Sequence, residues 1–273
     1  MTEVNRQVRL EPAGTTFTVS PGEAVLNAAL RQGIALRYGC RHGNCSTCKY
    51  LLLDGEVDHG VASPYSLSEA EREEGWALLC CARPTENLVI EDEQPVDEKA
   101  LPLLTPQDRT SIVTEVRPIG GSLWRLRVRL DEPLPFYAGQ FVELGVPGAV
   151  DTWRSYSIAS SPAQAEELEF IVKRIPGGAF SGQLGDDLVE HPIALRGPYG
   201  TGYLREGDRS VLLVAVGSGI APVLSIVRHA ADVGDPRTFL VAYGAREHTG
   251  LAVLDPLREL DGRLALTVIP AVS

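Results

Sequence analysis

Four cysteines in this sequence have the spacing of an electron-transfer centre. Cys40, Cys45 and Cys48 follow the pattern C-x4-C-x2-C, and a fourth thiol stands further along the chain, at Cys80 or at its neighbour Cys81. This is the ligand spacing of a plant-type 2Fe-2S cluster. Such a cluster accepts and releases one electron at a time, so the pattern predicts one-electron transfer. The spacing alone leaves the choice between Cys80 and Cys81 open.

The surroundings of these cysteines favour a cluster over zinc or disulfides. Gly39 and Gly43 allow tight turns, and the short polar side chains nearby can hold an irregular loop. Structural zinc would need a second C-x2-C or a histidine pair, which the sequence does not offer. Disulfides need an oxidising compartment, and the N-terminal residues have no apolar signal segment. We therefore expect a reduced, cytoplasmic iron-sulfur protein.

A second group of residues could hold a flavin dinucleotide. An FAD needs an aromatic ring to stack on, hydrogen bonds to its N5 edge, and cationic and backbone donors for its pyrophosphate. Tyr156 and Ser157 are the candidate catalytic residues that contact the reacting ring. The candidate FAD-binding residues form an R-x-Y-S motif, a strand end and a glycine loop: Arg154, Ser155, Tyr156, Ser157, Val172, Lys173, Gly177, Gly178 and Ser181. The R-x-Y-S motif by itself would be an ordinary strand, so the prediction depends on the combination.

A glycine turn near the end of the chain predicts a nucleotide site. The continuous apolar run 210–216 is typical of a strand buried on both faces. It is followed by a turn whose candidate residues are Gly217, Ser218, Gly219 and Pro222, and then by a helix to about Val233. A strand, a glycine turn and a helix N-terminus together present free N–H groups to phosphate. The turn is not a complete G-x-G-x-x-G, and any βα unit can turn on glycine.

The elements that position these groups fall into three segments. Residues 1–95 predict a small α+β unit, 96–107 a linker rich in charge and proline, 108–206 an antiparallel β-barrel, and 207–273 an α/β unit. In the first segment, Ser20 and Glu23 predict a capping box for a helix that stops near Gly33. The expected strands are 8–10, 16–19, 49–53, 87–91, 111–116, 124–130, 140–144, 156–159, 169–172, 193–196, 210–216, 238–243 and 264–270. The other expected helices are a charged one at about 67–74 and one that ends at about Leu260.

Composition sets further limits on function. The chain has 273 residues and a net charge of -11, which disfavours nucleic acid as a partner because phosphates demand basic patches. Residues 1–100 hold 9 Lys or Arg against 16 Asp or Glu, a balance of -7, which leaves -4 for the rest. An acidic face of this kind could steer a basic partner, although a merely solvated surface explains it equally well. No apolar run reaches about 18 residues, so no membrane span is expected.

The order of these segments resembles the reductase components of bacterial multicomponent oxygenases. The resemblance is closest to the phenol hydroxylase reductase group, which serves soluble di-iron monooxygenases, and is clearest in GEVDHGVASP at 55–64 and LLCCARP at 78–84. It implies a multidomain chain with a β-grasp ferredoxin domain, an FAD barrel and a partial doubly wound NAD domain. It also implies Cys80 as fourth ligand, with NADH bound at 217–222 and near Tyr243, Gly244 and Arg246. The implied partner is the hydroxylase component of a phenol- or alkane-type monooxygenase.

The sequence also departs from this family. Relatives often carry an acidic residue soon after the Y-G-x-R stretch, whereas Glu247-His248-Thr249-Gly250 follows here, which leaves the choice between NADH and NADPH open. Relatives also continue beyond the position of Ser273. A missing fourth strand would leave the apolar strand 210–216 at a sheet edge, so we expect a fragment or a covering chain. The alternative functions are a reductase for sugar deoxygenation and a passive electron carrier.

Overall fold

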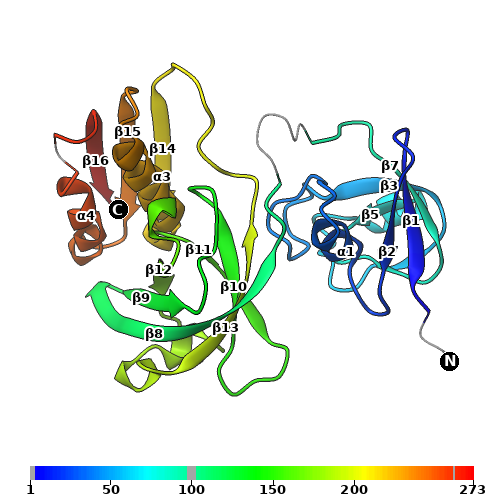
Figure 1. Ribbon diagram of the computed structural model, residues 1–273, viewed down its shortest axis with the longest axis horizontal. Helices are drawn as coiled ribbons and strands as arrows, with labels where there is room; N and C mark the ends of the chain where they lie inside the picture. Colours follow the sequence, from blue (N-terminus) through cyan, green and yellow to red (C-terminus); the bar gives the residue numbers. More distant parts are fainter. Residues whose placement is uncertain (1–3, 97–102, 261) are drawn as a thin grey trace. The chain divides into compact units, whose positions relative to one another are not determined.

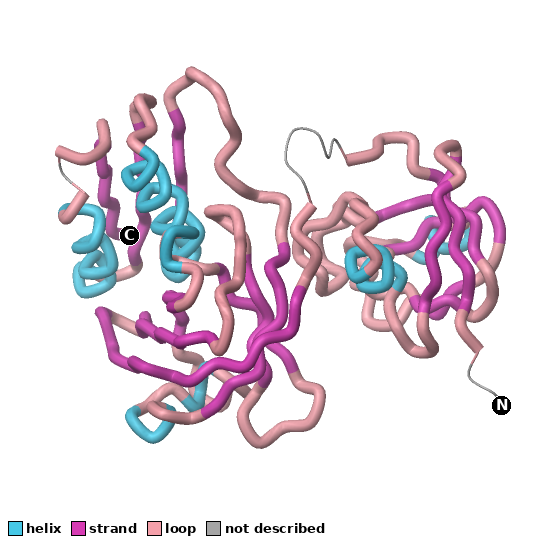
Figure 2. Tube along the Cα trace, viewed as in Figure 1, coloured by secondary structure: helices cyan, strands magenta, loops and turns pink. Residues whose placement is uncertain are grey.

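The computed structural model describes residues 4–96, 103–260 and 262–273 (Figures 1 and 2). It divides into two compact units, residues 1–106 and 107–273. The middle of the predicted linker, residues 97–102, lies outside the described residues. The predicted division at residue 206 falls within the second unit and stays a prediction.

The first unit is a mixed five-stranded sheet with a helix, which agrees with the predicted α+β ferredoxin fold. Its strand order is β2-β1-β7-β3-β5, with β1 parallel to β7 and the other pairs antiparallel. Val8, Phe17, Tyr50 and Leu88 belong to its buried core. The elements are β1 (Arg6–Glu11), β2 (Thr15–Val19), α1 (Val25–Arg31), β3 (Lys49–Asp54), β4 (Val57–Asp58), α2 (Glu69–Glu73), β5 (Trp76–Leu78), β6 (Arg83–Pro84) and β7 (Leu88–Glu91).

The capping box predicted at Ser20 and Glu23 does not begin the helix, although one of its two bonds forms: the Ser20 N–H donates to Glu23 Oε2 at 3.0 Å. Helix α1 begins later, after Ala24, and no side chain caps it. Ser20 and Glu23 instead close a turn, in which the Glu23 N–H donates to the Ser20 carbonyl at 3.0 Å. A capping box does form in this unit, at the start of α2, where Ser68 and Glu71 exchange hydrogen bonds.

Backbone carbonyls of the segment that contains the fourth thiol replace the missing cap of α1. The Val25 N–H donates to the Ala82 carbonyl at 3.0 Å, and the Leu26 N–H donates to the Leu79 carbonyl at 2.9 Å. These two carbonyls lie on either side of Cys80 and Cys81. Since the first N–H groups of a helix need partners from outside it, this contact fixes α1 and the cysteine pair to each other.

The first part of the second unit is the six-stranded antiparallel sheet that the barrel prediction required. Its order is β11-β10-β13-β8-β9-β12, and its edges are joined by one bridge, between Ile158 and Phe170, in place of a continuous ladder. The strand predicted at 156–159 lies at 153–157. The elements are β8 (Gln107–Gly120), β9 (Leu123–Leu130), β10 (Phe141–Gly145), β11 (Trp153–Ser157), η1 (Pro162–Gln164), β12 (Glu167–Lys173), η2 (Ser181–Gln183), η3 (Asp186–Leu188) and β13 (Pro192–Tyr199).

The second part of this unit has three parallel strands in the order β14-β15-β16. The predicted second helix consists of a 3-10 segment and a short α-helix, because Pro256 suits only the first turn of a helix. Leu123 and Ile171 of the barrel share one buried cluster with Ile220 and Leu224 of α3. The elements are β14 (Val211–Val216), η4 (Gly217–Gly219), α3 (Ile220–Val233), β15 (Phe239–Ala245), η5 (His248–Leu254), α4 (Asp255–Arg258) and β16 (Leu266–Val272).

Strand β14 lies at the edge of the parallel sheet, the position expected for the apolar strand 210–216. Alternate side chains of β14 differ in their exposure to solvent. Ala215 is buried on the face that α3 covers, whereas Leu212, Val214 and Val216 are 63%, 70% and 72% exposed on the other face. Because parallel strands are usually covered on both faces, this exposure is unusual.

Candidate cofactor sites

The cysteine loop directs its backbone N–H groups at sulfur. The Cys40 N–H donates to Cys45 Sγ at 3.2 Å, and the N–H groups of His42 and Asn44 donate to Cys40 Sγ at 3.3 and 3.4 Å. Burial alone would raise the pKa of the Cys45 thiol, but hydrogen bonds from Cys40 and Thr47 outweigh it and lower the pKa to about 7. Donors of this kind favour thiolates, the form of cysteine that binds iron.

Cys80 lies against another of the predicted cluster cysteines. Hydrogen bonds from the side chains of Cys48 and Cys81 lower the pKa of Cys80, and the Gly43 N–H adds to the effect. The same contact with Cys80, together with burial, raises the pKa of Cys48. Cys80 is therefore in contact with Cys48 and with the turn at Gly43, although it lies 32 residues beyond Cys48 in the sequence.

Cys81 fills a space under the cysteine loop. It is 4% exposed, and its Sγ lies 3.7 Å from Cys80 Sγ. Gly43 has a φ of +73°, and a Cβ built there would lie only 2.8 Å from Cys81 Sγ. Cys81 therefore packs directly against the turn that presents the neighbouring ligands.

The cysteine loop suits a two-iron cluster. Among the described residues, no three metal-binding side chains converge on one ion position. A 2Fe-2S cluster has four cysteine ligands shared between two irons, so it does not require such convergence. The N–H groups directed at Cys40 and Cys45 are the donors that such a cluster uses.

A cavity of about 380 Å³ joins the predicted flavin residues to the glycine turn. From the barrel, the lining includes Ser155, Tyr156, Ser157, Val172, Lys173 and Ser181, and from the turn after β14 it includes Ser218 and Gly219. The Tyr156 ring packs on Phe180, with ring centroids 5.1 Å apart. Burial raises the pKa of Tyr156 to about 12, so this phenol stays neutral and can donate a hydrogen bond. Sequence reasoning missed Ile171 and Ile175, whose apolar side chains have no distinctive pattern.

Arg154, Gly177 and Gly178 are not among the residues that line this cavity. Arg154 is exposed, and its Nη1 donates to the Trp153 carbonyl at 2.8 Å. The glycine loop contributes Ser181 to the lining of the cavity. The Ser181 Oγ accepts a hydrogen bond from the Ile175 N–H at 3.3 Å. A Cβ at Gly178 would lie 2.6 Å from that Oγ, so the glycine makes room for Ser181.

A larger cavity of about 620 Å³ contains further predicted nucleotide residues. Gly217, Tyr243 and Arg246 line it together with Lys173, whereas Pro222 and Gly244 do not. Gly217 has a φ of +56°, and a Cβ at Gly217 or Gly219 would meet nothing within 4 Å. No side chain caps α3; the glycine turn 217–219 runs into it as a 3-10 helix, so backbone N–H groups at the start of α3 donate to the Gly217 and Ser218 carbonyls and the turn itself forms the N-terminal end of the helical segment. This is the arrangement in which a helix N-terminus binds phosphate.

The Tyr243 side chain connects two segments that line this cavity. It is 1% exposed, and its hydroxyl lies 3.3 Å from the Gly217 carbonyl and 3.4 Å from the Gly250 carbonyl. Tyr243 thus links the turn after β14 to the segment after β15. Burial raises the pKa of its phenol, which keeps the hydroxyl available as a donor.

The turn between β8 and β9 also lines the larger cavity and was not predicted as part of a site. Gly120, Gly121 and Ser122 contribute to the wall, next to Arg174 and Glu247. Gly120 has a φ of +141°, and a Cβ there would collide with the Thr249 carbonyl. The Gly-Gly pair is a hairpin signal in the sequence, but nothing in it indicates what the turn approaches.

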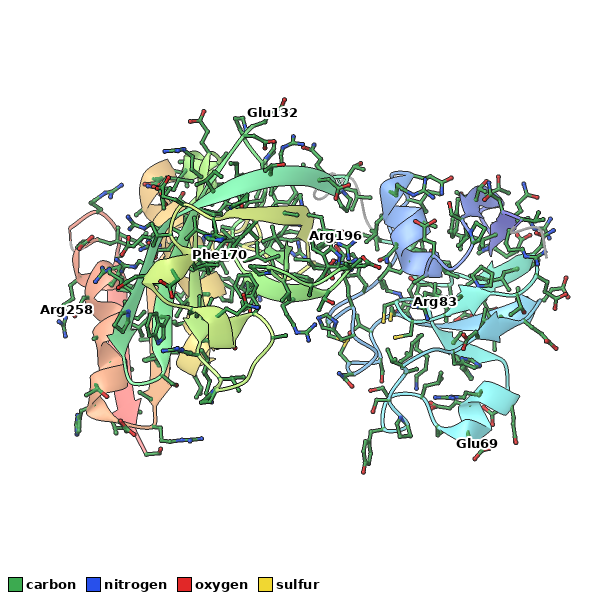
Figure 3. The ribbon with its side chains drawn as sticks, turned by 90° about the horizontal axis from the view of Figure 1, so that it is seen from below. Glu69, Arg83, Glu132, Phe170, Arg196 and Arg258 are labelled. Carbon is green, nitrogen blue, oxygen red and sulfur yellow. The ribbon has the colours of Figure 1, made fainter. Side chains whose placement is uncertain are left out.

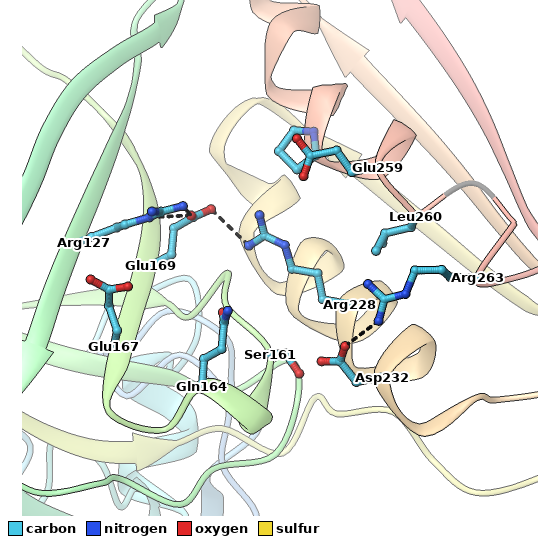
Figure 4. A pocket seen from close by; sticks show the side chains of 11 residues that line it. Arg127, Ser161, Gln164, Glu167, Glu169, Arg228, Asp232, Glu259, Leu260 and Arg263 are labelled. Atoms are coloured by element: carbon cyan, nitrogen blue, oxygen red, sulfur yellow. Dashed lines mark hydrogen bonds and ion pairs between the residues drawn. The ribbon is translucent and has the colours of Figure 1, made fainter.

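A third, polar cavity of about 270 Å³ surrounds Glu169 (Figure 4). Glu169 is 4% exposed, and it accepts from Arg127 Nη2 at 2.9 Å and from Arg228 Nη1 at 3.0 Å. Burial alone would raise the pKa of Glu169, but Arg228, Arg125 and Arg127 together lower it. Arg228 also donates to the Ala159 carbonyl at 2.7 Å, so this carboxylate ties α3 to the barrel.

Three family models match successive parts of the chain. They are a 2Fe-2S iron-sulfur cluster binding domain over residues 8–85, an oxidoreductase FAD-binding domain over 111–203 and an oxidoreductase NAD-binding domain over 213–273. With the sites described above, this set defines an NAD(P)H-dependent iron-sulfur flavoprotein oxidoreductase. Its cofactors are a 2Fe-2S cluster, FAD and a nicotinamide nucleotide.

Curated proteins and solved structures identify the family. The chain is 37% identical to the reductase component of phenol 2-monooxygenase from a Pseudomonas species, over 97% of this chain and 76% of that protein. It is 37% identical to the propane 2-monooxygenase reductase component of a Gordonia species, over 94% and 75%. An Amycolatopsis cytochrome P450 reductase structure superposes with a TM-score of 0.85 at 33% identity, over 98% and 80%. The chain belongs to the reductase components of bacterial multicomponent oxygenases.

Membership of this family means that the chain passes electrons from a nicotinamide nucleotide through FAD and a 2Fe-2S cluster to an oxygenase partner. In the described part of the chain, no helix has the length and apolar character needed to cross a bilayer.

Proposed function

We propose that the chain supplies electrons from NADH to the hydroxylase component of a di-iron monooxygenase that oxidises phenols or small alkanes. The observation that carries this proposal is the cavity of about 380 Å³ in which Tyr156, Ser157 and Lys173 face the same space as Ser218 and Gly219. A nicotinamide ring and a flavin must stack to exchange hydride, and in our proposal their two binding sites meet in this space. The relatives named for phenol and propane oxidation support the choice of partner.

The flavin, when bound, converts a two-electron hydride into single electrons that a cluster can accept. In our proposal, the ring of Tyr156, held by Phe180, provides the stacking surface, and the Ser157 hydroxyl donates to the N5 edge. Lys173 supplies positive charge where the two cavities adjoin, since it lines both. The exposed Arg154 can turn from the Trp153 carbonyl toward the pyrophosphate.

In the same proposal, Cys40, Cys45, Cys48 and Cys80 hold the cluster. The supporting observations are the N–H groups directed at sulfur in the loop and the contact of Cys80 with Cys48. Cys81 is not a ligand in this proposal, and the packing of its Sγ under Gly43 supports that choice.

For the coenzyme we favour NADH. The stretch that departs from the family pattern itself supplies a carboxylate, because Glu247 lines the larger cavity one residue after Arg246, just beyond the end of β15. A carboxylate at the end of the second strand accepts from ribose hydroxyls and repels a 2′-phosphate. The Thr249 hydroxyl lies 3.4 Å from Glu247 Oε2 and steadies it.

Anaerobic stopped-flow mixing of the purified protein with NADH tests this function. We expect the flavin absorbance to bleach first and the paramagnetic signal of a reduced 2Fe-2S cluster to follow. A flavin that NADH leaves oxidised would contradict the proposal and favour a passive electron carrier. Adding a purified di-iron hydroxylase should then reoxidise the cluster, which a reductase for sugar deoxygenation would not do.

A second candidate acceptor is a cytochrome P450. The Amycolatopsis structure is described as a cytochrome P450 reductase, and a 36% identical relative is the reductase subunit of an aromatic O-demethylase. A P450 that is reduced faster than a di-iron hydroxylase, at equal concentration, would favour this alternative.

A further inference from the structure

A short segment, residues 59–66, lies directly against the cysteine loop. The Ser63 N–H donates to the Gly43 carbonyl at 3.1 Å, and the Ser46 hydroxyl donates to the Ser66 carbonyl at 3.0 Å. Arg72 of α2 donates to the Ala62 carbonyl at 3.1 Å. Hydrogen bonds from two sides therefore hold the backbone of the 59–66 segment in place.

Two large side chains of this fixed segment are left in solvent. Val61 is 82% exposed and Tyr65 is 99% exposed, although Ala62 and Ser66, each next to one of them, are 8% and 5% exposed. The fold thus buries the small residues of the segment and presents the large ones. Exposed apolar side chains contribute little to stability, and when they stand together on an ordered surface they indicate a contact site.

Acidic residues flank this segment in the sequence on both sides. Residues 54–74 contain seven carboxylates and one arginine: Asp54, Glu56, Asp58, Glu69, Glu71, Glu73, Glu74 and Arg72. Lys49 pairs with Glu71, but the other six carboxylates are exposed. Glu69, for example, projects from the start of α2 into solvent (Figure 3).

We propose that Val61 and Tyr65 form the contact through which the oxygenase partner docks beside the cysteine loop. This inference rests on the proposed function, which supplies a protein acceptor for the electron. The partner surface that fits is an apolar pocket, deep enough for a tyrosine ring, with lysine or arginine at its rim.

The physical reasons concern both affinity and distance. A tyrosine buries a large area at low cost in side-chain entropy, and a few such anchors usually carry most of the binding energy of an interface. The exposed carboxylates attract a basic partner, and this attraction weakens as salt screens the charges. Because the 59–66 segment packs on the turn at Gly43, a partner bound to it lies next to the cysteines that give up the electron.

The test uses the full chain with Tyr65→Ser, Val61→Ser and the double substitution. Val150→Ser is the matched control, because Val150 is 95% exposed and belongs to the other unit. The acceptors are the purified hydroxylase component of a phenol 2-monooxygenase and the P450 of an aromatic O-demethylase. Each variant is first reduced with dithionite, so that the measured reoxidation of the cluster does not depend on NADH.

We expect the acceptor concentration for half-maximal reoxidation to rise about tenfold for Tyr65→Ser, the loss of one interface anchor, and further in the double variant. Val150→Ser should behave as wild type, and added salt should weaken the wild type. Unchanged half-saturation in the double variant would overturn the inference. So would slower reduction of the cluster by NADH without acceptor, which would assign the segment to the flavin unit of the chain itself.

The failure of the proposed function would look different. If neither acceptor reoxidises the dithionite-reduced wild type, the acceptor assignment fails, and the docking inference falls with it. If reoxidation is normal but NADH does not reduce the flavin, only the nicotinamide half of the proposed function fails. The Tyr65 comparison then still decides the docking inference.

Discussion

Cys80 and Cys81 are adjacent in the sequence, yet their surroundings differ. Cys80 contacts Cys48 and the Gly43 N–H, whereas the Cys81 sulfur lies under the Gly43 turn. Spacing could not distinguish these thiols, because either one completes a set of four. The packing at Gly43 supplies the distinction, and it depends on two segments that are far apart in the chain.

Substituting each of these cysteines separately tests the assignment. Cys80→Ser should abolish the cluster's absorbance and its paramagnetic signal, because the fourth thiolate is lost, while NADH still bleaches the flavin. Cys81→Ser should keep both signals, since serine has nearly the same volume. Visible absorption and electron paramagnetic resonance measure the outcome. A cluster that survives in the first variant and is lost in the second would reverse the assignment.

Ser157 can be tested without disturbing flavin binding. Ser157→Ala should slow flavin reduction by NADH about tenfold, because losing one hydrogen bond in an enclosed site costs on the order of 1.4 kcal/mol in the transition state. Flavin content, read from absorbance per protein, should stay the same. Equal rates of bleaching in stopped flow would show that the hydroxyl makes no contact with the reacting ring.

At the scale of elements, local sequence patterns predicted which helices and strands exist better than they predicted where each one begins and ends. The recurrence of short strand candidates between glycine and proline turns indicated every strand of the six-stranded sheet, because such turns are local signals. The start of α1 was misplaced because its N–H groups bind carbonyls on both sides of Cys80 and Cys81, a contact that no local pattern encodes. The cavity residue Ile171 was missed for the same reason, since only the packing of α3 on the barrel brings it together with Ala221.

Glu169 joins α3 to the barrel, so removing its carboxylate should destabilise the fold. Glu169→Gln should lower the free energy of unfolding by about 3 kcal/mol at neutral pH, the usual cost of breaking a buried ion pair. The folded-state pKa of Glu169 lies below its ordinary value of 4.5, so ionised Glu169 stabilises the fold above that pH. This stabilisation is lost as the pH falls through the lower folded-state pKa.

Urea unfolding of both proteins at several pH values measures the difference. The difference in unfolding free energy between wild type and Glu169→Gln should be constant from pH 7 to about pH 5 and should become smaller at more acidic pH. Glu167→Gln is the matched control, because Glu167 lies on the same strand and lines the same cavity but is exposed. A difference that does not change with pH would show that the hydrogen-bonding shape of Glu169, and not its charge, supports the contact.

At the scale of the whole molecule, the two compact units divide the chemistry. The first unit holds the five cysteines and most of the net negative charge, and the second holds both nucleotide cavities. The order of these parts could be predicted from motifs alone, because each motif is local. The shared lining of the flavin cavity could not, since Tyr156 and Ser218 lie 62 residues apart and meet only in the folded second unit.

The edge position of β14 has a consequence for exchange of backbone hydrogens with solvent. The Val211 N–H donates to the Thr238 carbonyl of the neighbouring chain segment. Because N–H directions alternate along a strand, the amides of Leu213 and Ala215 face β15, whereas those of Leu212 and Val214 point outward. In deuterated water we expect protons at the first pair to persist and those at the second pair to be lost quickly. Slow loss at Leu212 and Val214 would reveal a bound strand along this edge.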